Sequence, residues 1–177
     1  MKNVVNVVLF QSCWLTAVWG AGHGLAWAGP AVVTIFLLVH LGMLRPGEHR
    51  TELLYVVGVA SAGVLLDSWM YAAGVLTYPA AEAWSLPCAP PYIAALWVAF
   101  AMLPRFSLAW LKPRPWLAAL LGALGGPLSV YVGTSIGEPP VIAVGEAPAW
   151  SWFLVGCEYA LVVPVMLRFS GRGRPPE

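Results

Sequence analysis

The feature that most constrains the fold of this chain is an apolar run over residues 53–76, which holds one formal charge, Asp67. About 20 consecutive apolar residues in a helix cross the hydrocarbon core of a bilayer, so the run predicts a transmembrane helix. A carboxylate near the bilayer centre is disfavoured by roughly 2.5–3.5 kcal/mol and therefore usually faces the protein interior and has a function. Asp67 is thus the first candidate functional residue.

The composition indicates that the whole chain is solvated by lipid. Of the 177 residues, 60% are hydrophobic and only 10% are charged, and the mean hydropathy is +0.77. This leaves too little polar surface to enclose a water-soluble core of this size. The net charge of +1 is dispersed, which gives no basic face for nucleic acid.

No motif in the sequence indicates a metal or a known cofactor, so any cofactor is unknown. The three cysteines, Cys13, Cys88 and Cys157, form neither a C-x-x-C pair nor a cluster with histidine, which argues against a zinc site or a disulfide framework. The sequence also contains no serine in a G-x-S-x-G turn, no H-E-x-x-H motif and no glycine-rich phosphate loop.

Apolar runs separated by proline-rich or charged turns predict an all-α fold, a polytopic membrane bundle. A single transmembrane domain is expected over residues 1–170, followed by a short basic tail at 171–177. A cleaved signal peptide is the alternative reading of the first run, which continues past the usual length and lacks a clear cleavage site. The six transmembrane helices are expected at residues 4–22, 31–43, 53–76, 92–111, 116–135 and 150–169.

The basic residues predict the orientation of these helices. With the N-terminus inside, all nine lysines and arginines fall on the inner side, and the loops at 78–91 and 136–149, the first of which contains Glu82, carry none. Cytoplasmic loops are enriched in these residues, so both termini are expected to be cytoplasmic. The nine residues are Lys2, Arg45, Arg50, Arg105, Lys112, Arg114, Arg168, Arg172 and Arg174.

The estimated depth in the membrane is the same for Asp67 and for a second acid, Glu158. With a rise of about 1.5 Å per residue, Asp67 and Glu158 both lie roughly 12–14 Å below the outer surface. Pro127 cannot donate to the carbonyl of Ala123, so a kink or local unwinding is expected close to the midplane. Broken helices in transporters often mark binding sites. We therefore predict a polar cavity in the outer half of the membrane.

Asp67 and Glu158 are the candidate catalytic, proton-handling residues of this cavity. If their carboxyls approach each other they should share a proton, which suits acid/base chemistry or proton coupling. The alternative for Asp67 is structural, a protonated acid bonded to a freed carbonyl or a hydroxyl. The candidate substrate-binding residues are Ser68, Tyr71, Gly125, Gly126, Pro127, Ser129, Tyr131 and Tyr159.

Three further expectations concern packing and charge near the inner surface. Arg105 is expected to extend to lipid phosphates rather than to form a buried ion pair. Glu52 is placed at the inner interface beside Arg50. The Gly122-x3-Gly126 spacing is expected to let two helices approach closely.

Several short motifs resemble those of a known family. They are Phe10-Gln11 with Trp14, the L-L-D-S sequence that ends at Ser68, Gly74, Leu96-Trp97, and the run from Ala119 to Ser129. Together they resemble a bacterial inner-membrane family catalogued as a domain of unknown function, and the resemblance covers nearly the whole chain. It implies a multi-pass protein of the bacterial inner membrane. Members of that family look to be encoded near cyclopropane-fatty-acid-synthase-like and flavin amine-oxidase-like proteins, which implies a place in modifying or protecting membrane acyl chains.

Two main classes of function follow. The first is an enzyme or accessory subunit that modifies the acyl chains of membrane lipids, in which Asp67 accepts and returns a proton. An accessory subunit would have a membrane enzyme as its partner. The second is a small proton-coupled transporter that uses Asp67 and Glu158 and acts as a homodimer. A structural membrane subunit is a third reading.

Overall fold

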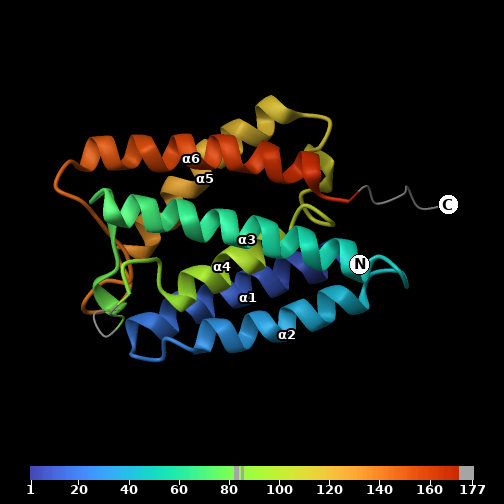
Figure 1. Cartoon of the computed structure of the whole chain (residues 1–177), viewed down its shortest axis with the longest axis horizontal. Helices are drawn as coiled ribbons and strands as arrows, with labels where there is room; N and C mark the ends of the chain where they lie inside the picture. Colours follow the sequence, from blue (N-terminus) through green and yellow to red (C-terminus); the bar gives the residue numbers. More distant parts are fainter. Residues whose placement is uncertain (82–83, 85, 172–177) are drawn as a thin grey trace.

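The computed structural model describes residues 1–81, 84 and 86–171. Glu82, Arg172 and Arg174 and most of the predicted tail lie outside the described residues. The chain is mainly helical, as predicted (Figure 1). Its α-helices are α1 (Lys2–Gly22), α2 (Ala28–Gly42), α3 (His49–Ala72), α4 (Pro91–Ala101), α5 (Pro115–Gly133) and α6 (Pro148–Phe169). Two short 3-10 helices, η1 (Pro79–Ala81) and η2 (Ala109–Leu111), and two strands, β1 (Leu76–Thr77) and β2 (Ala143–Val144), complete the described elements.

Four of these helices are long and apolar enough to cross a membrane, namely α1, α3, α5 and α6. This length and composition support the prediction of a multi-pass membrane protein. The other two helices are shorter, with 15 residues in α2 and 11 in α4. At 1.5 Å per residue α4 extends about 16 Å, roughly half of the hydrocarbon thickness.

The helix predicted at 92–111 ends early, at Ala101. The chain continues through turns over residues 102–108 into η2. Pro104 accounts for this end, because proline disfavours a helical conformation in the residue before it and has no N–H for the helical ladder. As a result the chain turns back beneath α4, and this places Arg105 and Ser107 at the N-terminal ends of α3 and α1.

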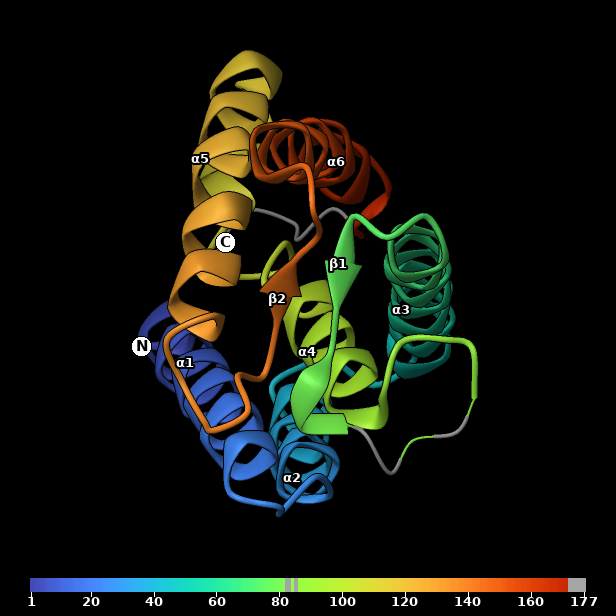
Figure 2. The same ribbon diagram turned by 90° about the vertical axis from the view of Figure 1, so that its left-hand side faces the viewer.

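The helix predicted at 53–76 also ends early, and a small sheet follows it. Gly74 has a φ of 68°, in the left-handed region where glycine is favoured, and it turns the chain out of α3. Leu76 and Thr77 of β1 then pair antiparallel with Val144 and Ala143 of β2. The sheet crosses one end of the bundle, between α6 and α4 (Figure 2). The two strands of this short β-ribbon thus lie at the end of the helix predicted at 53–76 and in the loop predicted at 136–149.

The helices pack as a four-helix block and a hairpin. Within the block, α1 packs on α2 and α4, and α4 also packs on α2 and α3, while α5 and α6 pack closely on each other. Side chains on Gly122 and Gly126 would overlap Tyr159, so these glycines let α5 approach α6 as the spacing predicts. The Tyr55 hydroxyl donates to the carbonyl of Met166 (2.9 Å) and ties the hairpin to α3.

The two internal prolines do not interrupt their helices. The α-helical assignment of α5 continues through Pro127 and that of α6 continues through Pro164, so the expected unwinding is not seen. Gly156 lies beside the carbonyl of Ala123, which Pro127 leaves without its helical partner. The close α5–α6 packing thus covers this carbonyl without breaking the helix.

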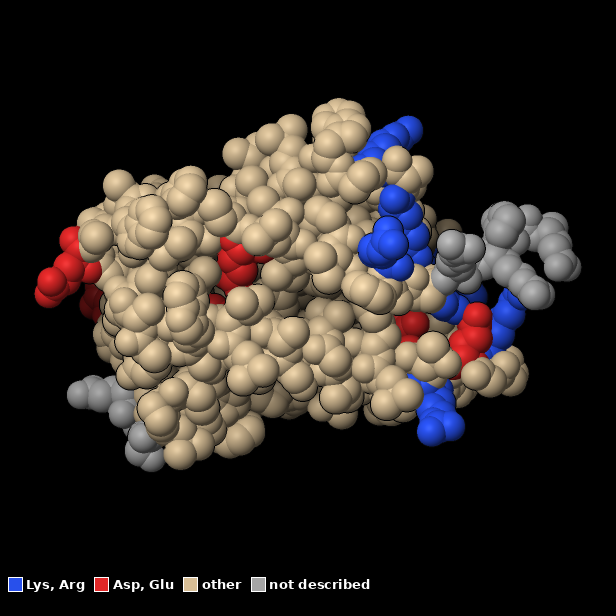
Figure 3. Space-filling view, turned by 45° about the horizontal axis from the view of Figure 1, so that its top comes forward, with Lys and Arg blue, Asp and Glu red and all other residues tan. Residues whose placement is uncertain are grey.

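On the face shown in Figure 3, lysines and arginines gather at one end of the molecule, and the long middle carries no basic residue and one patch of acidic atoms. This is the end that holds Lys2, Arg105 and Lys112, each of which contacts neighbouring chain there. The separation of the basic residues from this middle fits a protein embedded in a bilayer.

Candidate functional site

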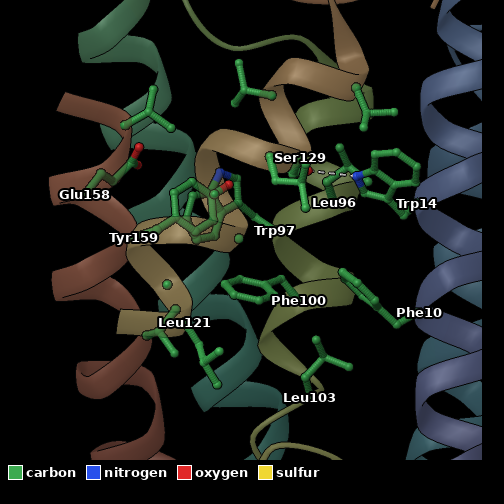
Figure 4. A pocket seen from close by; sticks show the side chains of 18 of the residues that line it. Phe10, Trp14, Leu96, Trp97, Phe100, Leu103, Leu121, Ser129, Glu158 and Tyr159 are labelled. Atoms are coloured by element: carbon green, nitrogen blue, oxygen red, sulfur yellow. Dashed lines mark hydrogen bonds between the residues drawn. The ribbon is translucent and has the colours of Figure 1, made fainter. Parts of the chain in front are cut away.

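A cavity of about 440 Å³ lies between the four-helix block and the α5–α6 hairpin. Its lining comes mainly from α1, α4, α5 and α6 and is largely apolar and aromatic (Figure 4). Six of the ten predicted site residues line it, which are Asp67, Gly125, Gly126, Ser129, Glu158 and Tyr159. The volume is in the range of pockets that hold small molecules, about 300–1,000 Å³.

Asp67 is 8% exposed, and both of its carboxylate oxygens are hydrogen-bonded. The indole N–H of Trp97 donates to Oδ2 (2.5 Å), and the hydroxyl of Tyr78 donates to Oδ1 (3.0 Å). Burial, and next the charge of Asp67, raise the pKa of the Tyr78 hydroxyl far above its usual value of 10.0, so this group keeps its proton. The carboxyl of Asp67 is therefore held by two fixed donors.

Trp97 is the residue that joins Asp67 to the rest of the cavity. Its ring stacks on Tyr159 of α6, with centroids 5.7 Å apart and planes 19° apart. On its other side it lies against Gly63 of α3, where any side chain would overlap the indole. Stacking and close packing fix the ring, and the ring fixes the N–H that reaches Asp67.

Glu158 differs from Asp67 because its carboxyl is not fully paired. The side chain is 7% exposed and lines the cavity, yet its Oε1 atom has no hydrogen-bond partner among the described residues. Within the same residues no hydrogen bond joins Glu158 to Asp67, so the shared proton expected for two adjacent carboxyls has no direct path between them. An unpaired buried carboxyl oxygen is free to bind a ligand.

The cavity opens sideways between α1 and α5. The exposed residues in its lining are Gln11 on α1 and Leu121, Gly125 and Leu128 on α5. The indole N–H of Trp14 donates to the hydroxyl of Ser129 (3.0 Å) and bridges these two helices (Figure 4). An opening on the apolar face of a membrane protein gives onto lipid rather than onto water.

The remaining four predicted site residues do not line the cavity. Ser68 donates to the carbonyl of Val64 (2.6 Å) and accepts from the amide of Ala89 (3.0 Å), which fixes the chain before α4. Tyr71 and Tyr131 are exposed, and Pro127 is half-buried within α5. The sequence placed these four residues near the acids, but their side chains do not line the same cavity.

A second set of buried charges lies at the basic end, and here the expectation for Arg105 is wrong. Its side chain is 9% exposed and pairs with Glu48 (Nη2 to Oε2, 2.6 Å) and, at 3.9 Å, with Glu52. Glu52 is buried and also contacts Nε2 of His40 (2.9 Å), so among the described residues its partners are His40 and Arg105 rather than Arg50. The early end of α4 explains the difference, because the turn that follows carries Arg105 inward. We call these four residues, His40, Glu48, Glu52 and Arg105, the inner ionic cluster.

Sequence reasoning assigned no role at the acid to Trp97 or Tyr78, the two donors to Asp67. The available signal is chemical, since a buried tryptophan or tyrosine needs a partner for its N–H or O–H. Trp97 lies in an apolar run and Tyr78 follows β1, so an acid at the same depth was a candidate acceptor for both. Within the described ranges, no three His, Cys, Asp or Glu side chains are grouped so as to hold a metal ion.

Comparisons with known proteins gave one match. A family model described as "Protein of unknown function (DUF2878)" matches residues 3–165, which cover five of the six α-helices almost entirely and most of α6. Searches of curated proteins and of solved structures returned no significant match.

Proposed function

The chain belongs to this family of proteins of unknown function, and we propose from its site that it binds the acyl chain of a membrane lipid in the cavity. In this proposal it serves as an enzyme or accessory subunit in the modification of such chains. The observation that carries it is an apolar cavity that opens toward lipid and holds two buried acids.

The shape of the cavity supports a ligand that enters from the bilayer. Its mouth lies between α1 and α5, among exposed apolar residues such as Leu121 and Leu128. Leu103, Leu108 and Leu111 line it toward the basic end. A hydrocarbon chain matches these walls, because burying apolar surface is favourable and no wall group needs a polar partner there.

Among the residues that the structure describes, the two acids supply the only formal charges in the lining. In an enzyme or an accessory subunit, Asp67 would accept or return a proton, with Trp97 and Tyr78 holding its carboxyl in place. The chemical step itself requires a group or a partner protein beyond these side chains, and this favours an accessory role. We further propose that the basic end faces the cytoplasm of a bacterial inner membrane, by the bias of Lys and Arg.

The alternative is a proton-coupled transporter that uses Asp67 and Glu158, acting as a homodimer. The unpaired oxygen of Glu158 favours it, because such a group can exchange a proton with a substrate. The sideways opening counts against it, because a transporter needs its site to reach water at each surface in turn.

Lipid profiling of cells that lack the gene tests the proposal. Wild-type protein is expected to restore a specific acyl species, and Asp67→Asn is expected not to restore it at equal membrane levels. Glu138→Gln, which changes an acid outside the cavity lining, is the matched control and should behave as wild type. If the lipid profiles with and without the protein are identical in normal and oxidative growth, modification of acyl chains is excluded and transport becomes the next assay.

A second experiment tests acyl-chain binding alone. The purified protein in lipid nanodiscs is exposed to a phospholipid with a photoreactive diazirine on its acyl chain, and labelled residues are mapped by mass spectrometry. Labelling should concentrate on cavity residues such as Phe100 and Leu111, in addition to the general labelling of outward-facing residues. Labelling confined to outward-facing residues such as Leu54 and Leu161 would overturn the proposal.

A further inference from the structure

We propose that the polar end of the bound lipid is a hydrogen-bond donor without negative charge, a hydroxyl or a protonated amine, and that Glu158 binds it. This inference rests on the proposed function, since it specifies the ligand of the same cavity. It goes beyond that function by excluding fatty-acid carboxylates and phosphate groups from the polar end of the site.

The carboxyl of Glu158 is the group in the cavity that lacks a partner. Its side chain is more than nine-tenths buried, and its Oε1 atom accepts no hydrogen bond from any described residue. Buried carboxyl oxygens are almost always paired, because an unpaired one has lost its water without gaining a donor. A ligand hydroxyl or ammonium at this position would supply that donor.

Asp67 does not compete for the same ligand group. Both of its oxygens already accept hydrogen bonds, one from Trp97 and one from Tyr78. Of the two acids in the lining, Glu158 is thus the one with an oxygen that accepts no hydrogen bond from the described residues. Asp67 contributes to the site by holding the indole of Trp97 in the wall of the cavity.

The charge of the cavity excludes an anionic ligand end. The lining contains two acids and, among the described residues, no lysine, arginine or histidine. A carboxylate or phosphate beside Glu158 would be a buried charge without a counter-ion, next to further negative charge in a medium of low dielectric. An ester has no hydrogen to donate, so it would leave Oε1 of a charged Glu158 unpaired. A hydroxyl is compatible with either protonation state of the acid, and an ammonium is attracted to its charged form.

The rest of the lining fits the hydrocarbon chain of such an amphiphile. From Glu158 the wall continues along α6 to Val163 and then to Leu108 and Leu111 near the basic end. Figure 4 shows Glu158 near the level of Trp97, with Phe100 and Leu103 further along the cavity. The polar end is thus placed at the acids and the chain extends toward the basic end.

Competition photolabelling tests this inference. The full chain in nanodiscs is labelled with hexadecanol that carries a diazirine on its chain, and unlabelled competitors of equal chain length are added. These are hexadecanol, hexadecylamine, palmitic acid, methyl palmitate and hexadecane. Hexadecanol and hexadecylamine are expected to compete roughly 10- to 100-fold better than the other three, the range for a hydrogen bond to a carboxylate.

Three variants connect the preference to Glu158. Glu158→Leu should bring hexadecanol down to the level of hexadecane while labelling by the phospholipid probe persists. Glu158→Gln keeps an amide oxygen as acceptor, so it should retain binding of hexadecanol and lose any advantage of the amine over the alcohol. Glu146→Gln, outside the lining, is the matched control and should leave the order of competitors unchanged.

The possible outcomes separate this inference from the function on which it rests. If neither the phospholipid nor the alcohol probe labels the cavity, the proposed function fails. If the cavity is labelled but palmitic acid or methyl palmitate competes as well as the alcohol, acyl-chain binding stands and the inference is wrong. Persistence of the alcohol preference in Glu158→Leu would also overturn the inference.

Discussion

Two groups of acidic side chains lie at different levels of the same bundle, and they differ in how their oxygens are paired. In the inner ionic cluster, Glu52 contacts His40 and Arg105, and Arg105 also holds Glu48. In the cavity, Oε1 of Glu158 has no hydrogen-bond partner among the described residues, and these residues place no cation in the lining. A buried acid whose partners come from other segments of the chain joins those segments. One without a partner is a site for something that the chain does not supply.

The largest expected effect is on the paired group. Replacing Arg105 by methionine leaves Glu52 buried without its cation, and breaking a buried ion pair typically costs about 3–5 kcal/mol. We expect the free energy of unfolding to fall by about 3 kcal/mol, the low end of that range, because Glu48 is partly exposed. Thermal unfolding in detergent, followed by tryptophan fluorescence, measures the loss.

Arg114→Met is the matched control for that experiment. Arg114 is exposed, its guanidinium lies 5.9 Å from the centre of the Trp110 ring, and no described acid pairs with it, so its loss should cost less than about 1 kcal/mol. If both variants lose the same free energy of unfolding, the inner ionic cluster does not stabilise the fold. The contrast between this cluster and the cavity would then have no energetic basis.

A smaller effect is expected from moving the donor that holds Asp67. A side chain on Gly63 overlaps the indole of Trp97, so Gly63→Val should displace the ring and its N–H from Asp67. Overpacking of this kind costs typically 1–3 kcal/mol, and we expect about 2 kcal/mol in unfolding experiments. Gly58→Val, on the same helix but facing open space, is the control and should have little effect. Similar losses in both variants would mean that the contact with Trp97 is not specific.

Glu158→Leu should change the free energy of unfolding in the opposite direction. An unpaired buried polar group lowers stability, so its removal is expected to leave the free energy of unfolding unchanged or to raise it by about 1 kcal/mol. Glu52→Leu, the same change in the inner ionic cluster, should instead lower it, because Arg105 and His40 lose a partner. If Glu158→Leu is the more destabilising of the two, Glu158 has a structural role and the comparison between the two groups is reversed.

The presence of the two acids in one cavity could be predicted from the sequence, but not their partners. Helical rise places Asp67 and Glu158 at one level from the ends of their apolar runs, and both line the same cavity. The helical rise per residue gives a position along the helix axis, but it does not determine which way a side chain faces or which helix packs against it. The sequence therefore missed the pairing of Asp67 with Tyr78, which comes from the loop side, and placed the exposed Tyr71 in the site.

The error at Arg105 has a similar origin. An apolar run from 92 to 111 predicted a full span, and a basic residue near the end of a span usually extends to lipid phosphates. The run does not reveal that α4 ends at Ala101 and that the next residues turn inward. Hydropathy records how apolar a segment is, and it cannot tell a long helix from a short helix followed by a buried turn.

The smallest expected effect is the pH dependence of the inner ionic cluster. The hydrogen bond from Arg105 to Glu48, with smaller contributions from the Arg45 amide and from the charges, lowers the pKa of this carboxyl below its ordinary value of 4.5. Because the folded pKa is below the unfolded one, the stabilisation is fully present above about pH 4.5 and is lost as the pH falls through the folded pKa. Glu48 is more than one-third exposed, so solvent screening limits the effect to a few tenths of a kcal/mol. Unfolding curves of wild type and Glu48→Gln between pH 7 and pH 3 should therefore converge at the acid end. A constant difference between them would mean that Arg105 does not pair with Glu48 in solution, and that Glu52 alone is its partner.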